Sequence, residues 1–257
     1  MAFLERTNQA DAARSLADFL GVRPDLSNGR SNWKHQPTIE PLQPIPPERG
    51  KSKCANIARR IWCSSIPADG TPVEAYLRSR GISLPIPLTL HFHAGLKHPT
   101  GKIWPAMIGL VTRGTDNTPL AIHRTFLAHN GADKAPITPQ KMMLGPCRGG
   151  AVRLGTPGDV LMVGEGLETC LAVMQATGCP AWAALSTSGL RALDLPDSIR
   201  DVIVLADGDD PGEAAARDAA LAWRQDGRRV RIANPGNGLD FNDLLLGQEP
   251  LHKECTT

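Results

Sequence analysis

The sequence of 257 residues lacks the features of several protein classes. Its six cysteines form no C-x-x-C pair and no zinc-ribbon or zinc-finger spacing, so we expect reduced thiols and no structural zinc. No stretch approaches the roughly 18 apolar residues that indicate a membrane span. Glu5 and Arg6 stand where a signal peptide would need apolar residues. We therefore expect a cytoplasmic protein with no membrane partner.

A nucleotide-binding loop of the G-x-x-x-x-G-K-[ST] type is also missing. Tyrosine occurs once, as Tyr76, in the predicted helical segment EAYLRSR. A covalent mechanism that uses tyrosine needs an exposed nucleophile, and a residue in this setting is better explained by helix packing. The sequence therefore disfavours an enzyme that cleaves a nucleic-acid strand through a covalent bond to tyrosine.

Charge is present in both signs but is unevenly distributed. Residues 1–150 carry 19 Lys and Arg against 10 Asp and Glu, whereas residues 151–257 carry 9 against 16, which gives +9 and −7. A basic part that binds phosphates, joined to an acidic part that gathers divalent cations, would suit an enzyme acting on nucleic acid. Two domains whose surfaces attract each other would show the same asymmetry.

The chain divides by composition into four regions. We predict an N-terminal helix at 1–20, a proline-rich linker at 21–52, a basic α+β domain at 53–156 and an acidic α/β domain at 157–248. Proline and polar residues in the linker offer little apolar area to offset chain entropy, so we expect no packed core there.

The basic region mixes helices and strands. The segment CANIARRIWCSS predicts a helix with Ile57, Ile61 and Trp62 facing inward. A second helix should begin at Thr71, with Glu74 completing a capping box. Apolar alternation then predicts the strands LTLHFH, IWPAMIGLVT and PLAIHRTFLA.

After residue 157 the pattern changes to short apolar runs that alternate with helical segments. The runs VLMV, AWAAL, VIVLA and RVRIA are almost wholly apolar, as in strands buried on both faces. The C-terminal region is therefore predicted to be a parallel four-stranded sheet with helices on both faces.

Acidic residues follow the first and third of these strands. Glu165 comes after the first strand, and Asp207 and Asp209 come after the third. The carboxyl ends of parallel strands near a switch in strand order form a ligand crevice, and crowded carboxylates there require a cation such as Mg²⁺ or Mn²⁺. Each acid alone could instead cap a helix N-terminus. The combination favours a catalytic metal site formed by Glu165, Asp207 and Asp209.

Three further acids support this site. Glu168 lies one helical turn after Glu165, and we expect it to orient neighbours or cap the helix rather than bind metal. Asp240 and Asp243 belong to an acidic loop after the fourth strand, which could reach the same crevice.

These motifs resemble a known family. The residues Glu165-Gly166, Asp207-Gly208-Asp209 with Gly212, and Asp240-Phe241-Asn242-Asp243 are similar to the Toprim domain shared by bacterial primases, topoisomerases and some nucleases. The resemblance implies that Asp207 and Asp209 are metal carboxylates and that Glu165 is a metal ligand or general acid/base. The preceding segment AIHRTFLAHNGADKAPITPQKMMLGPCRGGAVRLG resembles that of primase-like proteins of phages, plasmids and other mobile elements.

Basic residues of this preceding segment are candidates for binding nucleotide or nucleic-acid phosphates. Arg124 lies inside an apolar strand, where a charged residue usually has a partner or a function, and it forms our preferred pair with Lys141. Lys134 and Arg148 are further candidates, for which a solvated surface position is an equal alternative.

The resemblance implies a DNA primase, a nucleotidyltransferase that makes short RNA primers during DNA replication. Its expected partners are a single-stranded DNA template, nucleoside triphosphates and a separate replicative helicase. The sequence departs from such primases because it lacks a zinc ribbon and a helicase domain. A metal-dependent Toprim nuclease and a non-catalytic nucleic-acid-binding regulator are the alternatives.

Overall fold

The computed structural model describes residues 9–22, 53–236 and 239–247, so the linker predicted at 21–52 lies almost entirely outside the described residues. The upstream half contains α1 (Gln9–Phe19), α2 (Lys53–Ser64), β1 (Ile66–Pro67), α3 (Pro72–Ser79), β2 (Leu90–Lys97), β3 (Ile103–Arg113), β4 (Pro119–Phe126), β5 (Lys141–Leu144) and β6 (Gly150–Arg153). The C-terminal half contains β7 (Val160–Gly164), α4 (Leu167–Thr177), β8 (Ala181–Ala183), α5 (Thr187–Ala192), β9 (Asp201–Leu205), α6 (Asp210–Gln225), β10 (Arg229–Ala233) and α7 (Phe241–Leu245).

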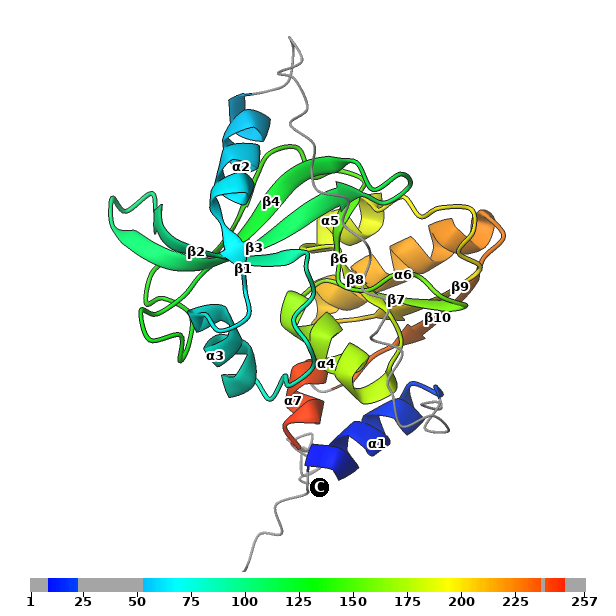
Figure 1. The fold of residues 1–257 in the computed structure, drawn as a ribbon. Helices are drawn as coiled ribbons and strands as arrows, with labels where there is room; N and C mark the ends of the chain where they lie inside the picture. Colours follow the sequence, from blue (N-terminus) through cyan, green and yellow to red (C-terminus); the bar gives the residue numbers. More distant parts are fainter. Residues whose placement is uncertain (1–8, 23–52, 237–238, 248–257) are drawn as a thin grey trace, which may run out of the picture.

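One sheet runs through both halves (Figure 1). In the described part of the chain its main path is β1-β2-β3-β6-β8-β7-β9-β10, and β4 and β5 branch from β3. The upstream strands pair antiparallel, and β6 joins β8 antiparallel through Val152 with Ala183 and Arg153 with Trp182. The two halves therefore share backbone hydrogen bonds.

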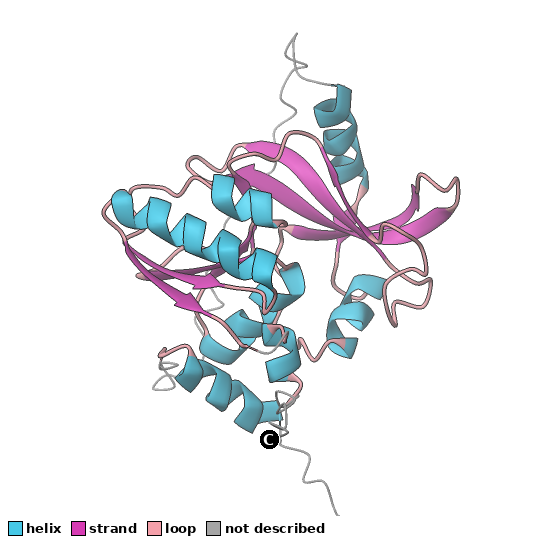
Figure 2. Ribbon diagram, turned by 180° about the vertical axis from the view of Figure 1, so that it is seen from behind, coloured by secondary structure: helices cyan, strands magenta, loops and turns pink. Residues whose placement is uncertain are grey.

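The last four strands form the predicted parallel sheet. β8, β7, β9 and β10 lie side by side in parallel, so chain order reverses around β7. Helices α4, α1 and α7 cover one face, and α5 and α6 pack together on the other (Figure 2). This arrangement confirms the predicted fold class.

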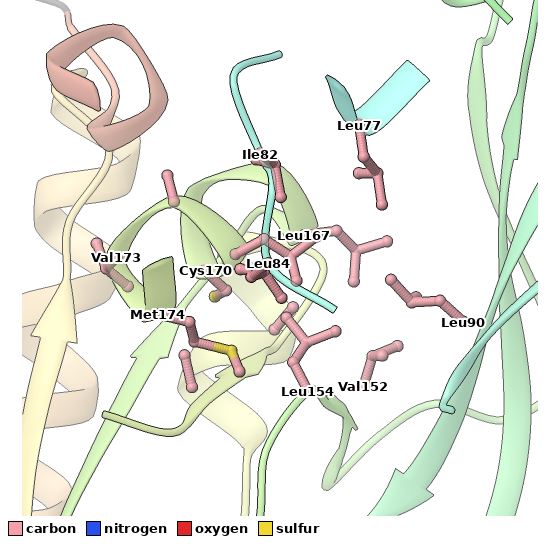
Figure 3. Close-up of a cluster of buried hydrophobic side chains, with 14 of the residues drawn as sticks. Leu77, Ile82, Leu84, Leu90, Val152, Leu154, Leu167, Cys170, Val173 and Met174 are labelled. Carbon is pink, nitrogen blue, oxygen red and sulfur yellow. The ribbon is translucent and has the colours of Figure 1, made fainter. Parts of the chain in front are cut away.

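A shared apolar core fixes the upstream half against α4 (Figure 3). Leu77 and Leu90 come from the upstream half, and Leu167 and Cys170 come from α4. All four side chains are almost completely removed from solvent, and such burial is the main stabilising contribution to a fold. The relative position of the two halves is consequently set by close packing.

The upstream helices agree with the sequence only in part. Trp62 faces inward from α2 as predicted, but the prediction for Ile57 is wrong, since its side chain is 47% exposed and Ala58 is buried in its place. Thr71 caps α3 by accepting a hydrogen bond from Val73 N at 3.2 Å. The expected capping box does not close on Thr71, because Glu74 accepts instead from the Gly70 amide at 2.7 Å.

The predicted N-terminal helix is present as α1 and packs on α4 and α7. Leu16 in α1 and Leu20 directly after it are buried, and the rings of Phe19 and Phe241 lie 6.4 Å apart. Gly21 follows in the left-handed region with φ 62°, which ends the helix without the cost of a Cβ atom. No helix among the described residues combines the length and apolar character needed to cross a membrane.

Candidate active site at the carboxyl edge of the parallel sheet

A polar pocket lies at the carboxyl edge of the parallel strands and is bordered by both halves of the chain. Its volume is about 170 Å³. We call it the edge pocket; its lining residues are Arg80, His123, Lys134, Lys141, Glu165, Gly166, Leu167, Glu168, Thr169, Leu185, Asp207 and Asp240.

The acidic side of the edge pocket begins with Glu165 and Asp207. Glu165 comes directly after β7 and Asp207 comes two residues after the end of the neighbouring β9, at the point where strand order reverses. Burial raises the pKa of both carboxyls, and the charges of neighbouring acids raise it further, with Asp207 acting on Glu165 and Asp240 acting on Asp207. Asp207 Oδ1 is buried and accepts no hydrogen bond from any described residue. The negative charges of Glu165 and Asp207 are therefore not balanced by hydrogen bonds from neighbouring groups in the described part of the chain.

Asp209 is close to these carboxylates, but its side chain has a structural contact. Its charge raises the pKa of Glu165 and Asp207. One carboxylate oxygen, Oδ1, accepts a hydrogen bond from Gly212 N at 2.7 Å and so caps α6. A Cβ added at Gly212 would lie 2.8 Å from that oxygen, which explains the glycine at this position. Among the residues that the structure describes, none donates a hydrogen bond to the other oxygen of Asp209.

The acidic loop after β10 contributes Asp240 to the edge pocket. Asp240 and Asp243 form a capping box at the start of α7, in which Asp240 Oδ1 accepts from Asp243 N at 2.8 Å. Burial raises the pKa of Asp240. Asp243 accepts from the Asp240 amide at 3.0 Å, and it does not line the edge pocket. Of the two predicted loop acids, the structure brings only Asp240 to the site.

The basic side of the edge pocket comes from the upstream half. Lys141 starts β5, Lys134 lies in the loop between β4 and β5, and Arg80 follows the last turn of α3. The Arg80 Nε atom is buried and has no hydrogen-bond partner among the described residues. Three cationic side chains therefore face the carboxylates across one pocket.

Glu168 lies between these cations on the first turn of α4. It accepts a hydrogen bond from Lys141 Nζ at 2.9 Å and one from Tyr76 Oη at 2.6 Å, and Lys134 Nζ lies 4.0 Å away. Burial alone would raise the pKa of Glu168, but Lys141, Lys134 and the Tyr76 hydroxyl hold it well below its usual range. Glu168 is consequently an ionised carboxylate inside the protein. Tyr76 is fully buried, so it cannot act as an exposed nucleophile.

His123 is the neutral member of the edge pocket. Its side chain is 5% exposed, and Nδ1 has no hydrogen-bond partner among the described residues. Burial, reinforced by the charge of Lys141, lowers the pKa of His123 to about 4, although Glu168 opposes this shift. The imidazole therefore stays uncharged beside the cations at neutral pH.

The depressed pKa predicts a pH-dependent stability. As the pH falls below 6.5, the pKa of the histidine in the unfolded chain, the unfolded chain binds a proton that His123 in the folded protein does not bind. The free energy of unfolding therefore decreases until the pH reaches about 4, the pKa of His123 in the folded protein. Between about pH 7 and pH 5 this costs about 2 kcal/mol. His123→Leu should remove that part of the pH dependence, measured by urea unfolding of both proteins at the two pH values. An unchanged difference between the two pH values would show that His123 titrates normally.

Two of the predicted phosphate-binding residues lie away from the edge pocket. Alternation along β4 places Arg124 on the face opposite His123, where its Nη2 donates to the Met143 carbonyl at 3.0 Å and its guanidinium lies over Phe126. Of the preferred candidates Arg124 and Lys141, only Lys141 therefore lines the edge pocket, and a phosphate-binding role of Arg124 stays a prediction. Arg148 is exposed in the turn between β5 and β6.

A larger hollow of about 500 Å³ lies at the opposite, amino end of β9 and β10. Its arginines are already engaged: Arg229 pairs with Asp201, Arg228 with Asp226, and Arg224 binds a backbone carbonyl. Among the described residues that line this hollow, there is no cluster of free carboxylates or cations like the one in the edge pocket. The larger volume is therefore no reason to place the functional site there.

Comparison with known proteins agrees with this geometry. Residues 160–249 match the Toprim domain family, and residues 52–154 match a domain of unknown function (DUF7146). The C-terminal half is a Toprim domain. A search of curated proteins gave no significant match.

About three quarters of the chain is also similar in fold to primase catalytic cores. The structure of the DnaG primase catalytic domain bound to ssDNA matches with a TM-score of 0.50 and 17% identity, covering 76% of each chain. The DnaG catalytic core gives the same TM-score and identity, with 76% of this chain and 74% of that chain covered. The chain thus combines a C-terminal Toprim domain with the fold seen in these primase catalytic cores.

The Toprim carboxylates fit a divalent cation. Asp207 Oδ1 has no hydrogen-bond partner among the described residues, and neighbouring carboxylates raise the pKa of both Glu165 and Asp207, so a bound cation would relieve this repulsion. Among the described residues, no three acidic, histidine or cysteine side chains form a metal site by themselves. Mg²⁺ does not need such a cage, since it is bound through one or two carboxylates, several waters and substrate phosphates.

Sequence reasoning missed three residues of the site. Arg80 and His123 line the edge pocket, and Tyr76 binds Glu168 from α3. The alternation along PLAIHRTFLA did indicate that His123 and Arg124 point to opposite faces, but it did not indicate which face borders the Toprim domain. For Arg80 and Tyr76 the sequence contains no comparable signal.

Proposed function

We propose that this protein is a primase, which synthesises short RNA primers on single-stranded DNA in a metal-dependent reaction. The observation that carries the proposal is the edge pocket, in which the carboxylates of the Toprim domain face cations of the upstream half. Its volume of about 170 Å³ is below the roughly 300–1,000 Å³ of whole-ligand pockets, and it suits phosphate groups with a hydrated cation.

The acidic side is proposed to hold Mg²⁺ or Mn²⁺ through Glu165, Asp207 and Asp209. When bound, such a cation neutralises charge that develops on a reacting phosphate. Asp207 offers a free, buried oxygen, and Asp209 retains one oxygen beside its capping contact. Asp240 adds negative charge that acts on Asp207, whereas Asp243 supports Asp240 by completing the capping box of α7.

The basic side is proposed to bind the triphosphate of an incoming nucleotide. Lys141 and Lys134 can donate charge-assisted hydrogen bonds to phosphate oxygens, and Arg80 presents a guanidinium from α3. Phosphoryl transfer depends mainly on positioning and charge stabilisation, which this arrangement supplies from two sides. The uncharged His123 keeps a hydrogen-bonding group in the edge pocket without adding charge.

The template is proposed to be single-stranded DNA. The fold shared with the DnaG catalytic domain, which was solved bound to ssDNA, supports this choice. Arg148 is exposed next to β5 and is a candidate contact to the template backbone, outside the edge pocket. A replicative helicase of the kind used by phages and plasmids would act as a separate partner.

A single assay tests the proposal against its alternatives. The protein is incubated with single-stranded DNA, Mg²⁺ or Mn²⁺ and labelled nucleoside triphosphates, and the products are separated by length. Short labelled RNA supports a primase. Shortened DNA without RNA would point to a nuclease, and unchanged DNA with no RNA would point to a non-catalytic binding protein.

A further inference from the structure

Glu168 is contacted by three separate segments of the upstream half. Tyr76 comes from α3, Lys141 from β5 and Lys134 from the loop before β5, and all three reach one carboxylate on α4. Their sequence separations from Glu168 range from 27 residues for Lys141 to 92 for Tyr76. The contacts therefore connect the Toprim domain with otherwise unrelated parts of the upstream half.

The carboxylate of Glu168 differs from those of Glu165 and Asp207 in being fully engaged. One oxygen accepts from Tyr76, the other accepts from Lys141, and Lys134 approaches the first. A buried ion is tolerated only when partners and hydrogen bonds compensate the lost hydration. These partners leave Glu168 little capacity to bind a metal, and they give it a different task.

We propose that Glu168 is a positioning residue that places the three cations of the edge pocket. It holds Lys141 and Lys134 directly, because an ammonium group on a long flexible stem otherwise samples many rotamers. Through Tyr76 it also fixes α3, and Arg80 follows one turn later on the same side of that helix. This inference rests on one part of the proposed function, namely that these cations bind a phosphate chain. It does not depend on primer synthesis.

The alternative is that Glu168 is merely a counter-charge for two lysines. The two roles predict opposite effects of Glu168→Gln on anion binding. Loss of a negative charge makes the edge pocket more positive, so a counter-charge role predicts tighter binding of an anion. A positioning role predicts weaker binding, because the lysines lose the acceptor that orders them.

Binding of inorganic triphosphate, measured by calorimetry without divalent metal, separates these roles. Glu168→Gln should weaken binding about tenfold, the scale of one charge-assisted hydrogen bond. Lys141→Ala should also weaken binding in the natural protein, but its additional effect in the Glu168→Gln background should be under about twofold, because contacting residues are not additive. Tighter binding by Glu168→Gln, or full additivity of the two changes, would overturn the proposal.

Tyr76→Phe gives an independent test that leaves every charge of the edge pocket in place. Charge alone predicts no change, whereas positioning predicts about threefold weaker triphosphate binding from the loss of one hydrogen bond. This variant decides the question if Glu168→Gln does not fold, and unchanged affinity would contradict the proposal. Absence of triphosphate binding by the natural protein would also overturn it. Primer synthesis is scored separately, so triphosphate binding with the expected variant effects would stand even if no RNA is made.

Discussion

Replacing Asp207 with Asn should reduce magnesium-dependent synthesis by more than about 100-fold. Changes to residues that only support a metal ligand cost up to about 100-fold, and Asp207 is proposed to be a ligand itself. The amide keeps the shape of the side chain but loses the charge that attracts a cation. Because burial and the charge of Asp240 raise the pKa of Asp207, its ionised form is costly in the metal-free protein. Asp207→Asn should therefore be at least as stable as the natural protein.

Asp210→Asn is the matched control for this experiment. Asp210 is exposed, three residues after Asp207 and at the start of α6, and it does not line the edge pocket. Its replacement should leave synthesis within about twofold, as expected for an exposed residue without a special contact. Thermal melting of both variants checks folding. Full activity of a folded Asp207→Asn protein would remove the carboxylate crevice from the proposed mechanism.

Replacing Lys141 with Ala should weaken nucleoside triphosphate binding by about 1.5–3 kcal/mol, the usual contribution of a hydrogen bond to a charged group. The loss should appear mainly as a raised KM, which steady-state synthesis at varied nucleotide concentration measures. Raised salt should reduce the difference between the two proteins, because ions screen this exposed ammonium.

Arg148→Ala provides the control for Lys141→Ala. It removes one positive charge from the same half of the protein, but from an exposed turn outside the edge pocket. Its KM for nucleotides should be unchanged, while template binding and its salt dependence should fall slightly. Equal effects of the two variants on nucleotide KM would mean that overall charge, rather than the edge pocket, binds the triphosphate.

The parallel sheet and its acidic edge could be predicted from the sequence because both signals are local. Strands buried on both faces produce continuous apolar runs, and parallel strands end at a common edge. Glu165 and Asp207 each follow closely on such a run, and Asp240 lies in the acidic loop after the last one. Their approach to one pocket follows from topology, without knowledge of any side-chain contact.

The basic side could be predicted only in part. Lys134 and Lys141 are candidates from the sequence and line the edge pocket, but the other members depend on contacts between distant segments. Tyr76 and Glu168 are separated by 92 residues, and only the packing of α3 against the Toprim domain brings them together. On β4 the period of two separates His123 from Arg124 correctly, but the choice of the functional face depends on where β5 and α4 lie. Charge inside an apolar strand pointed to Arg124, whose partner is a backbone carbonyl.

The error at Ile57 has a similar origin. The segment CANIARRIWCSS contains several apolar residues spaced for a helix, and a helical pattern alone allows more than one inward face. Packing over β4 selects the face that carries Ala58 and Trp62, which leaves Ile57 in solvent.

The antiparallel junction between β6 and β8 determines how this protein can be divided for study. A fragment that begins near residue 157 would match the Toprim family, yet it would present β8 as an open edge strand. It would also expose the apolar surface of α4 that the upstream half covers. Open edges and large apolar patches promote aggregation, so fragments cut at the family boundary should be poorly soluble. Fragments intended for biochemistry should keep residues 9–247 together, because α1 also packs on α4 and α7.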